Sequence, residues 1–458
     1  MRASKSRFFA ASAGVAAAAL VLAGCSGANE LKGGGSGGST ETGSADCSKF
    51  EEYGKHEGEA VNIFSSIREV EADQLQQTFD KFEECTGIKV THNGVGEFES
   101  QVLVQVEGGN APDLAIFPQP GLLKRMVEGG HVKPAPAEVE KKVDEGWSED
   151  WKAYGTVDGK FYAAPLMASV KSFVWYSPKM FKEGGYEIPQ TWDDMMKLTE
   201  KIAADHPDGD AKPWCAGIES GGATGWPATD WLEDAVLRAG GGDVYDKWVN
   251  HEIPFNDPKI VEATEMTGKI LRDDKFVNGG IGDARSVATT SFNDGGLPIL
   301  EGKRYMYRMA SFYEAQWPEG TKVSEDGDVF AFYLPGMTAD EKPLLTAGEF
   351  VGAFNDRDAT KAVQAYMASS EWANTRVEIG GVTSANKGVD PSLASSDILR
   401  LAMELLQDKD AVARFDGSDL MPSEVGAGSF WKGMTQWLNG EKDANTVLTE
   451  IESSWPKK

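Results

Sequence analysis

Short apolar segments alternate with amphipathic helical segments along this chain, and that alternation limits the folds it can adopt. Ser66 and Glu69 have the spacing of a capping box, which predicts a helix after the first strand, and Gly87 is expected to end that helix. The first strands are expected at 61–64, 88–90 and 114–117, each followed by a helix. This order is typical of a parallel sheet with helices on its faces, where ligands bind at the loops that follow the strands.

The same alternation restarts after Gly159, so a second sheet is expected. Thr191 caps one helix of this part, and Pro227 lies near the start of another. Further strands are expected at 172–176, 214–218, 305–309, 329–334 and 350–354, the last two returning the chain to the first sheet. Helices are expected at 359–369, 392–406, 430–438 and 444–451. Two sheets joined by several crossings imply a hinge and a cleft, which is a common position for a ligand.

The N-terminal segment has the features of a secreted lipoprotein. Basic residues at positions 2, 5 and 7 precede an apolar run, 10–22, that is too short to remain across a bilayer. The run ends on LAGC, so Cys25 is expected to be acylated; the alternative is an ordinary secretory signal with a coincidental cysteine. We therefore assign 1–24 to a signal peptide and 25–47 to a lipid-anchored, flexible linker rich in glycine and serine. The protein is expected at the cell surface, on the outer face of the cytoplasmic membrane.

The charge of the chain argues against two classes of partner. The chain has 72 acidic and 45 basic residues, a net charge of −27. So acidic a surface argues against nucleic acid and against direct binding to anionic lipid. The chain also has 13 tryptophans, which are costly as core filler but offer flat apolar faces to sugar rings.

The cysteines and histidines favour a disulfide over a metal site. Cys47 and Cys85 flank the first strand–helix unit, so a bridge between them is expected in an oxidising compartment. Cys215 would then be a buried free thiol. The sequence has no C-x-x-C pair and its five histidines lack ligand spacing, so no metal or other cofactor is expected.

Several stretches of the chain resemble the carbohydrate-binding proteins of ABC importers, the extracellular solute-binding family that includes maltose-binding protein. The matching stretches are 79–90 (FDKFEECTGIKV), 108–114 (GGNAPDL), 158–165 (DGKFYAAP), 189–194 (PQTWDD) and 333–335 (YLP). Together they span nearly the whole mature chain in the family's order. Three more stretches look like the α-glucoside-binding branch: 116–121 (IFPQPG), 225–231 (GWPATDW) and 414–422 (RFDGSDLMP).

The resemblance implies an α/β fold of two lobes, the type II periplasmic-binding-protein arrangement, with mostly parallel sheets flanked by helices and a hinge between the lobes. The first lobe is expected at 48–165 plus 336–355, and the second at 166–335 plus 356–458. The implied function is to bind an oligosaccharide, such as an α-glucoside, in the cleft and deliver it to permease subunits that work with a cytosolic ATPase. Such a protein is a monomer and not an enzyme.

Candidate contacts in the second lobe combine aromatic and polar residues. The resemblance implies a stacking platform at Trp431, where the maltose-binding relative has a tryptophan; helix packing is the alternative. Trp226 lies in a glycine-rich loop, where a tryptophan has little structural role, and is expected to bind ligand. Asp230, one turn further on, either binds hydroxyls or interacts with the helix N-terminus. Ser311 and Phe312 lie where the family has another contact loop, although Phe312 can equally be a core residue.

Candidate contacts in the first lobe lie on loops at strand ends. Ser66, Arg68 and Gln119 occupy these loops, although Ser66 can be a helix cap alone. The family's aromatic residue beside Gln119 is Pro118 here, so one stacking surface is missing on that side. Glu349 precedes a hinge strand and is expected at the floor of the cleft.

Sugar hydroxyls take hydrogen bonds from carboxylates, amides and arginine, and one buried group that selects a hydroxyl is worth roughly 1–3 kcal/mol. Arg414 and Asp416 are expected to form a charged pair in a loop, either as a salt bridge or as a clamp on the sugar.

Two other functions are alternatives. A glycoside hydrolase needs two carboxylates about 5–10 Å apart across the glycosidic bond, and the sequence has no such signature. The same fold can also carry an iron chelate, a polyamine or a peptide, which the tryptophan-rich loops disfavour. Calcium could bind at 208–210 or 326–328, but both segments are first of all polar turns.

Overall fold

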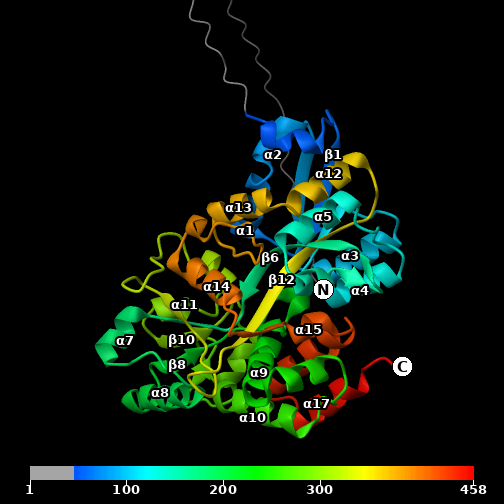
Figure 1. Cartoon of the computed structure of the whole chain (residues 1–458). Helices are drawn as coiled ribbons and strands as arrows, with labels where there is room; N and C mark the ends of the chain where they lie inside the picture. Colours follow the sequence, from blue (N-terminus) through cyan, green and yellow to red (C-terminus); the bar gives the residue numbers. More distant parts are fainter. Residues whose placement is uncertain (1–45, 458) are drawn as a thin grey trace, which may run out of the picture. The chain divides into compact units, whose positions relative to one another are not determined.

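Two β-sheets with helices packed on them make up residues 46–457, the part of the chain that this computed structural model describes (Figure 1). The expected signal peptide, the acylated Cys25 and the linker up to residue 45 lie outside the described residues. Within 46–457, no helix is both long enough and apolar enough to cross a membrane.

The first sheet has the strand order β13-β12-β3-β1-β2, and β6 also pairs with β12. Its strands are β1 (Ala60–Ser65), β2 (Lys89–Gly94), β3 (Leu114–Phe117), β6 (Ala163–Val170), β12 (Pro343–Ala353) and β13 (Val412–Phe415). β1 runs parallel to β2 and β3, so the loops that follow β1 and β3 lie at the same edge of the sheet. β12 is antiparallel to β3 and β6 but parallel to β13, so the sheet has three parallel and two antiparallel strand pairs.

The second sheet has the order β11-β7-β10-β8-β9. Its strands are β7 (Phe173–Tyr176), β8 (Lys212–Cys215), β9 (Val277–Asn278), β10 (Arg304–Arg308) and β11 (Phe330–Tyr333). This sheet is mixed as well, because β7 is antiparallel to both β10 and β11. The expected return of 329–334 to the first sheet is wrong, because β11 pairs with β7; β12 is the strand that brings the chain back to the first sheet.

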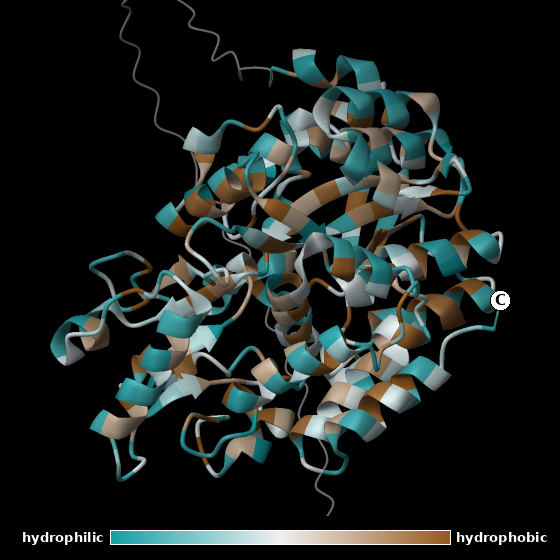
Figure 2. Cartoon of the chain, turned by 60° about the horizontal axis from the view of Figure 1, so that its bottom comes forward, coloured by the Kyte–Doolittle hydropathy of each residue, from teal (hydrophilic) through white to brown (hydrophobic). Residues whose placement is uncertain are grey.

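Each sheet has its own apolar core, and Figure 2 shows mostly apolar strands inside with hydrophilic residues on the outer helix faces. The first core includes Phe82 and Leu114, and the second includes Trp175, Trp214 and Met306. β12 runs from one core to the other (Figure 1).

The expected assignment of 356–458 to the second lobe needs a correction. Helices α12 (Asp358–Met367) and α13 (Ser370–Ile379) pack in the first core through Tyr366 and Trp372, because their apolar faces cover the sheet beside β1. The chain contributes to the second core again from Ile398.

Short loops and the following helices complete the two parts. On the first sheet these are α1 (Glu69–Gln77), α2 (Asp80–Thr86), α3 (Phe98–Glu107), α4 (Pro120–Glu128), α5 (Ala137–Gly146) and α6 (Glu149–Tyr154). On the second they are α7 (Pro178–Gly184), α8 (Trp192–Asp205), α9 (Trp226–Val249), α10 (Pro258–Leu271), α11 (Leu297–Leu300), α14 (Asp397–Gln407), α15 (Gly417–Leu420), α16 (Trp431–Leu438) and α17 (Ala444–Ser453). Minor elements are the two-stranded β4 (Thr156–Val157) and β5 (Lys160–Phe161) and short turns of helix at Ser48–Tyr53 (η1), Gly221–Ala223 (η2), Ala284–Thr289 (η3), Ser311–Gln316 (η4), Pro391–Leu393 (η5) and Val425–Phe430 (η6).

Two expected helix starts have different outcomes. The hydroxyl of Thr191 accepts a hydrogen bond from the backbone N–H of Asp194 at 3.1 Å, so this cap is confirmed. The capping box of Ser66 and Glu69 is wrong. The helix begins at Glu69, and no side chain makes a capping hydrogen bond at its start. Glu69 has a positive φ of 54°, so the backbone turns sharply where the loop passes into the helix.

A disulfide joins Cys47 to Cys85, as expected, and ties the N-terminal turn η1 to α2. Cys215 is a buried free thiol in the second sheet. The bridge closes a long segment that includes β1 and α1, so it restricts the unfolded chain.

Replacing Cys47 and Cys85 with serine is expected to lower the free energy of unfolding by about 4 kcal/mol, the loop-closure value for a sequence separation of 38 residues. Chemical denaturation of the wild type, with and without reductant, and of the double variant measures this change. An unchanged denaturation midpoint after complete reduction would contradict the expected role of the bridge.

Candidate ligand-binding site

A cavity of about 210 Å³ lies where the two cores meet. The loops after β1 and β3 and the start of α1 supply its first wall, including Ser66, Arg68 and Gln119. The start of α9, the segment 292–293, η4 and Trp431 supply the opposite wall. The cavity therefore combines strand-end loops of one sheet with aromatic residues packed on the other.

Four aromatic side chains form one wall of the cavity. The rings of Trp226 and Phe292 are 5.1 Å apart between centroids, and those of Trp226 and Phe312 are 6.1 Å apart. Trp431 is 3% exposed, and its indole N–H donates to the hydroxyl of Ser418 at 3.4 Å. These rings offer flat apolar faces directly beside polar groups.

Gly225 brings the two tryptophans of this wall together. It has a φ of 115°, and a Cβ atom there would lie 2.3 Å from the carbonyl oxygen of Trp431. Only glycine can adopt this conformation at such a close approach. Trp226 follows immediately as the first residue of α9.

Two carboxyl groups and an arginine lie together on the first-lobe side. Glu349 and Glu71 line the cavity, and Arg376 is buried close to both. Burial, together with the negative charge of Glu71, raises the pKa of Glu349 to about 8, although Arg376 opposes this shift. Glu349 is therefore protonated at neutral pH and can donate a hydrogen bond into the cavity.

Gln119, which lines the same cavity, has an unsatisfied amide oxygen. The side-chain N–H of Gln119 donates to Glu99 at 3.0 Å, while its Oε1 is buried and has no hydrogen-bond partner among the described residues. A buried acceptor left unpaired costs about 1–3 kcal/mol, so a ligand hydroxyl that donates to it would be favourable.

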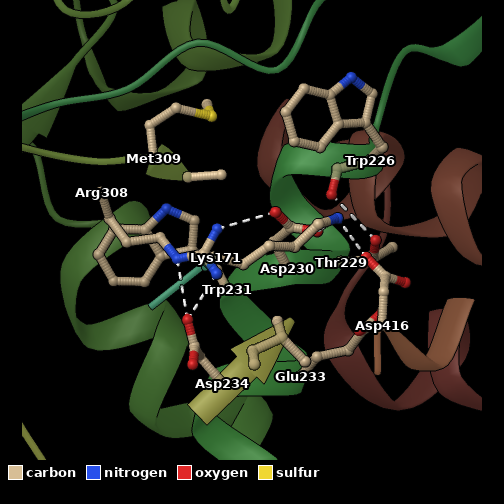
Figure 3. Close-up of polar contacts among 12 residues, drawn as sticks. Lys171, Trp226, Thr229, Asp230, Trp231, Glu233, Asp234, Arg308, Met309 and Asp416 are labelled. Carbon is tan, nitrogen blue, oxygen red and sulfur yellow. Dashed lines mark hydrogen bonds and ion pairs between the residues drawn. The ribbon is translucent and has the colours of Figure 1, made fainter. Parts of the chain in front are cut away.

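Lys171 lies in the cavity wall between β6 and β7 and is 6% exposed (Figure 3). Its ammonium donates to Asp230 of α9 at 2.8 Å and also to Asp416, which precedes α15. The same ammonium lies 5.2 Å from the ring centroid of Trp226. Burial opposes its charge, but Asp230 and Asp416 raise the pKa of Lys171 well above its ordinary value.

The buried network continues along one face of α9. Arg308, at the end of β10, donates to Asp230 at 2.9 Å and to Asp234 (Figure 3). Glu233 accepts backbone N–H bonds from Gly417 at 2.7 Å and from Ser418 at 3.1 Å. The charges on α9 thus bind segments from β7, β10 and α15.

Seven of the eleven residues predicted to contact ligand line this cavity: Ser66, Arg68, Gln119, Trp226, Phe312, Glu349 and Trp431. Ser66, Arg68 and Gln119 lie on loops at strand ends, and Trp226, Phe312 and Trp431 belong to the aromatic wall. Glu349, which was expected before a hinge strand, lies within β12. Contact between these seven residues and a ligand is a proposal.

The other four predicted residues do not reach the cavity wall. Asp230 is fully buried and bound by Lys171 and Arg308, and the hydroxyl of Ser311 accepts from the backbone N–H of Val170. Arg414 and Asp416 do not pair with each other, because each has a nearer partner. The guanidinium of Arg414 binds both oxygens of Asp246 at 2.6 and 2.8 Å, and Asp416 caps α15 and accepts from Lys171.

Several polar residues of the wall were not predicted from the sequence: Glu71, Glu99, Lys171, Asn293, Gln316 and Asp419. Lys171 could have been predicted, because it lies directly before an apolar strand. A lysine buried at such a position needs charged or polar partners. The others lie on amphipathic or irregular segments whose inward faces have no distinctive pattern. Among residues 46–457, no group of three or more potential ligands is arranged to hold a metal ion.

Comparison with known proteins identifies relatives along nearly the whole described chain. A family model described as bacterial extracellular solute-binding protein matches residues 68–374. The chain is 37% identical over 412 residues to the osmoprotective compounds-binding protein GgtB of Synechocystis sp., covering 88% of this chain and 94% of that protein. It is 35% identical over 423 residues to the alpha-glucosides-binding periplasmic protein AglE of Rhizobium meliloti, covering 90% of each.

Solved structures show the same fold. The chain is similar to a chitin oligosaccharide binding protein with a TM-score of 0.72 and 17% identity, over 86% of this chain and 97% of that one. At this identity the similarity concerns the arrangement of the two sheets and their helices.

Glu349→Gln is expected to change how stability depends on pH. The folded-state pKa of Glu349, about 8, lies above its ordinary value of 4.5, so its contribution to stability is complete below pH 4.5 and is lost as the pH rises through 8. Glutamine does not ionise, so the thermal midpoint of the variant should rise relative to that of the wild type between pH 5 and pH 9. The exposed Glu107→Gln serves as control, and parallel curves for E349Q and wild type would contradict the buried position of this carboxyl group.

Proposed function

Because the chain belongs to the bacterial extracellular solute-binding protein family, we propose that it captures an oligosaccharide in the cavity and delivers it to an ABC permease. Proteins of this family bind their solute without making or breaking a bond, so the chain is a binding protein and not an enzyme. This argues against the glycoside hydrolase alternative.

The observation that carries the proposal is the composition of the cavity. Aromatic faces at Trp226 and Trp431 lie beside hydrogen-bonding groups such as Gln119 and Glu349. The apolar faces of sugar rings stack on such indoles, while ring hydroxyls exchange hydrogen bonds with carboxyl, amide and ammonium groups. Neutral Glu349 and Lys171, whose charge is balanced by two carboxylates, suit an uncharged ligand better than an ion.

We propose an α-linked gluco-oligosaccharide, such as a disaccharide, as the ligand. The 35% identity to AglE, named for α-glucosides, over 90% of the chain supports this choice. GgtB, at 37% identity, is named for osmoprotective compounds, so small neutral osmolytes belong in the same test. The cavity of about 210 Å³ in this arrangement favours a short ligand.

Closure of two lobes around the ligand is part of the proposal. The carboxylate of Glu97, next to α3, accepts a hydrogen bond from the backbone N–H of Gly222 in η2 at 2.9 Å, so one contact spans from the first part to the second. A Cβ atom at Gly222 would lie 2.2 Å from Glu97 Oε2, so glycine permits this contact. A ligand that binds both walls would shift the equilibrium toward this closed arrangement.

Delivery needs a partner in the membrane. We propose that permease subunits recognise the closed form and that a separate cytosolic ATPase supplies the energy, while the protein acts as a monomer. Acylation of Cys25 and the linker up to residue 47 would keep the folded part at the membrane surface.

Thermal-shift screening followed by calorimetry tests the ligand class. The panel consists of trehalose, maltose, sucrose, raffinose, diacetylchitobiose, amino acids and metal ions. An α-glucoside is expected to raise the thermal midpoint and to give a saturable binding isotherm. Stabilisation only by a compound that is not a sugar would overturn the proposed ligand class.

Trp226→Ala and Trp431→Ala are each expected to weaken binding of the stabilising sugar by roughly 10-fold or more, because each removes an apolar face from the cavity. Trp455→Ala is the matched control, since Trp455 stacks on His251 near the C-terminus. Calorimetry gives the dissociation constants, and unchanged values for both cavity variants would contradict the proposed site.

Glu97→Ala is expected to weaken binding about fivefold, as for the loss of one hydrogen bond of about 1 kcal/mol that forms only when the lobes close. Gly222→Ala should act in the same direction, because its Cβ displaces the carboxylate. Glu107→Ala at the end of α3 is the control. Equal affinities for wild type and E97A would show that this contact does not contribute to closure.

A further inference from the structure

We propose that Lys171 is a positioning residue that couples occupation of the cavity to the hinge, by holding two chain segments together while offering its remaining N–H to a ligand hydroxyl. This inference rests on the proposed function in one respect, because the ligand that it invokes is the proposed sugar. The hinge part stands on contacts within the protein and is tested separately.

Lys171 lies at the first point where the chain passes from one sheet to the other. It comes directly after β6 of the first sheet and two residues before β7 of the second. Its backbone N–H donates to the carbonyl oxygen of Leu345 at 2.8 Å, on β12 where the chain returns. One residue thus connects the outgoing and returning segments through its backbone alone.

The side chain of Lys171 adds a third segment. Its ammonium donates to Asp416, whose own backbone N–H donates to the carbonyl oxygen of Thr346 at 2.8 Å. It also donates to Asp230 on α9 at 2.8 Å. The ammonium therefore holds the segment before α15 against α9, next to the point where β12 changes from one core to the other.

The remaining N–H of the ammonium has no acceptor among the described residues. An ammonium has three N–H groups, and two of them bind Asp230 and Asp416. The side chain is 6% exposed, and what it exposes lines the cavity below the ring of Trp226. When a sugar ring stacks near Trp226, one of its hydroxyl groups can accept this third hydrogen bond.

Burying the Lys171 ammonium costs free energy, which indicates that this residue has a role beyond packing. A buried lysine must be paired, and pairing at this point could have been replaced by apolar contacts of the same volume without loss of stability. Because the pairing at this point is ionic, the geometry of the hinge depends on the Lys171 ammonium, which also faces the ligand. A ligand that orients the ammonium thereby favours one arrangement of the three segments.

Two variants test the inference. Lys171→Met removes the ammonium, and Lys171→Met combined with Asp416→Asn removes one positive and one negative charge, so that the second variant folds even if the first does not. Lys342→Met is the matched control, because Lys342 forms an ion pair with Asp408 at 2.6 Å outside the cavity. Calorimetry with maltose and trehalose gives affinities, and small-angle X-ray scattering gives the radius of gyration with and without saturating sugar.

Both Lys171 variants are expected to bind roughly 10- to 100-fold more weakly, as for the loss of a hydrogen bond from a charged group, and to lose the decrease in radius of gyration on binding. The control is expected to behave as the wild type. Binding by the double variant within threefold of the wild type, with the same decrease in radius, would overturn the inference.

The ligand-free proteins distinguish this inference from the proposed function. If the wild type binds neither sugar, the proposed ligand class fails, but the hinge part can still be judged. Without ligand, the double variant is expected to have a larger radius of gyration than the wild type, because Asp416 is no longer tied through Lys171 to the crossing between β6 and β7. Identical scattering curves would overturn the hinge part of the inference.

Discussion

The charged face of α9 is the constraint on which the rest of the structure depends. Asp230, Glu233, Asp234 and Arg238 lie on neighbouring turns of one helix, and all four are buried. They bind Lys171, Arg308, backbone N–H groups of α15 and carbonyl groups of the segment before β12. Removing one partner of a buried pair leaves an uncompensated charge, which costs about 3–5 kcal/mol, so these segments cannot slide past α9.

This constraint also shapes the cavity. α9 begins with Trp226 on the aromatic wall, and one turn later Asp230 holds Lys171 at the edge of the same cavity. The first sheet supplies loops at one shared edge, because β1 and β3 are parallel. The ligand site therefore arises where a fixed helix and a fixed sheet edge meet.

Most elements of this fold could be predicted from the sequence, because local signals specify them. Short, mostly apolar runs marked β1 and β3, and Thr191 capped α8 as expected. Ser66 failed as a cap because the chain after β1 turns through Arg68 and a left-handed Glu69 before the helix starts. β13 was not predicted, since its first residues are exposed and its pairing with β12 is a tertiary contact.

The site was predictable only where a residue had an unusual local position. Trp226 and Gln119 stood out because each lies at a helix start, Trp226 as the first residue of α9 and Gln119 directly before α4. The acidic residues of α9 have the spacing of a solvated helix face, and their basic partners lie about 60 to 80 positions away, so the sequence does not reveal that they are buried. Arg414 and Asp416 were paired with each other for the same reason, although Asp246 and Lys171 are their partners.

The most direct test of the central claim is a crystal structure of the protein with maltose. We expect one disaccharide in the cavity, stacked on Trp226 or Trp431, with a hydroxyl within hydrogen-bond distance of the Lys171 ammonium. A disaccharide bound elsewhere on the protein, with this cavity filled by rearranged side chains, would contradict it.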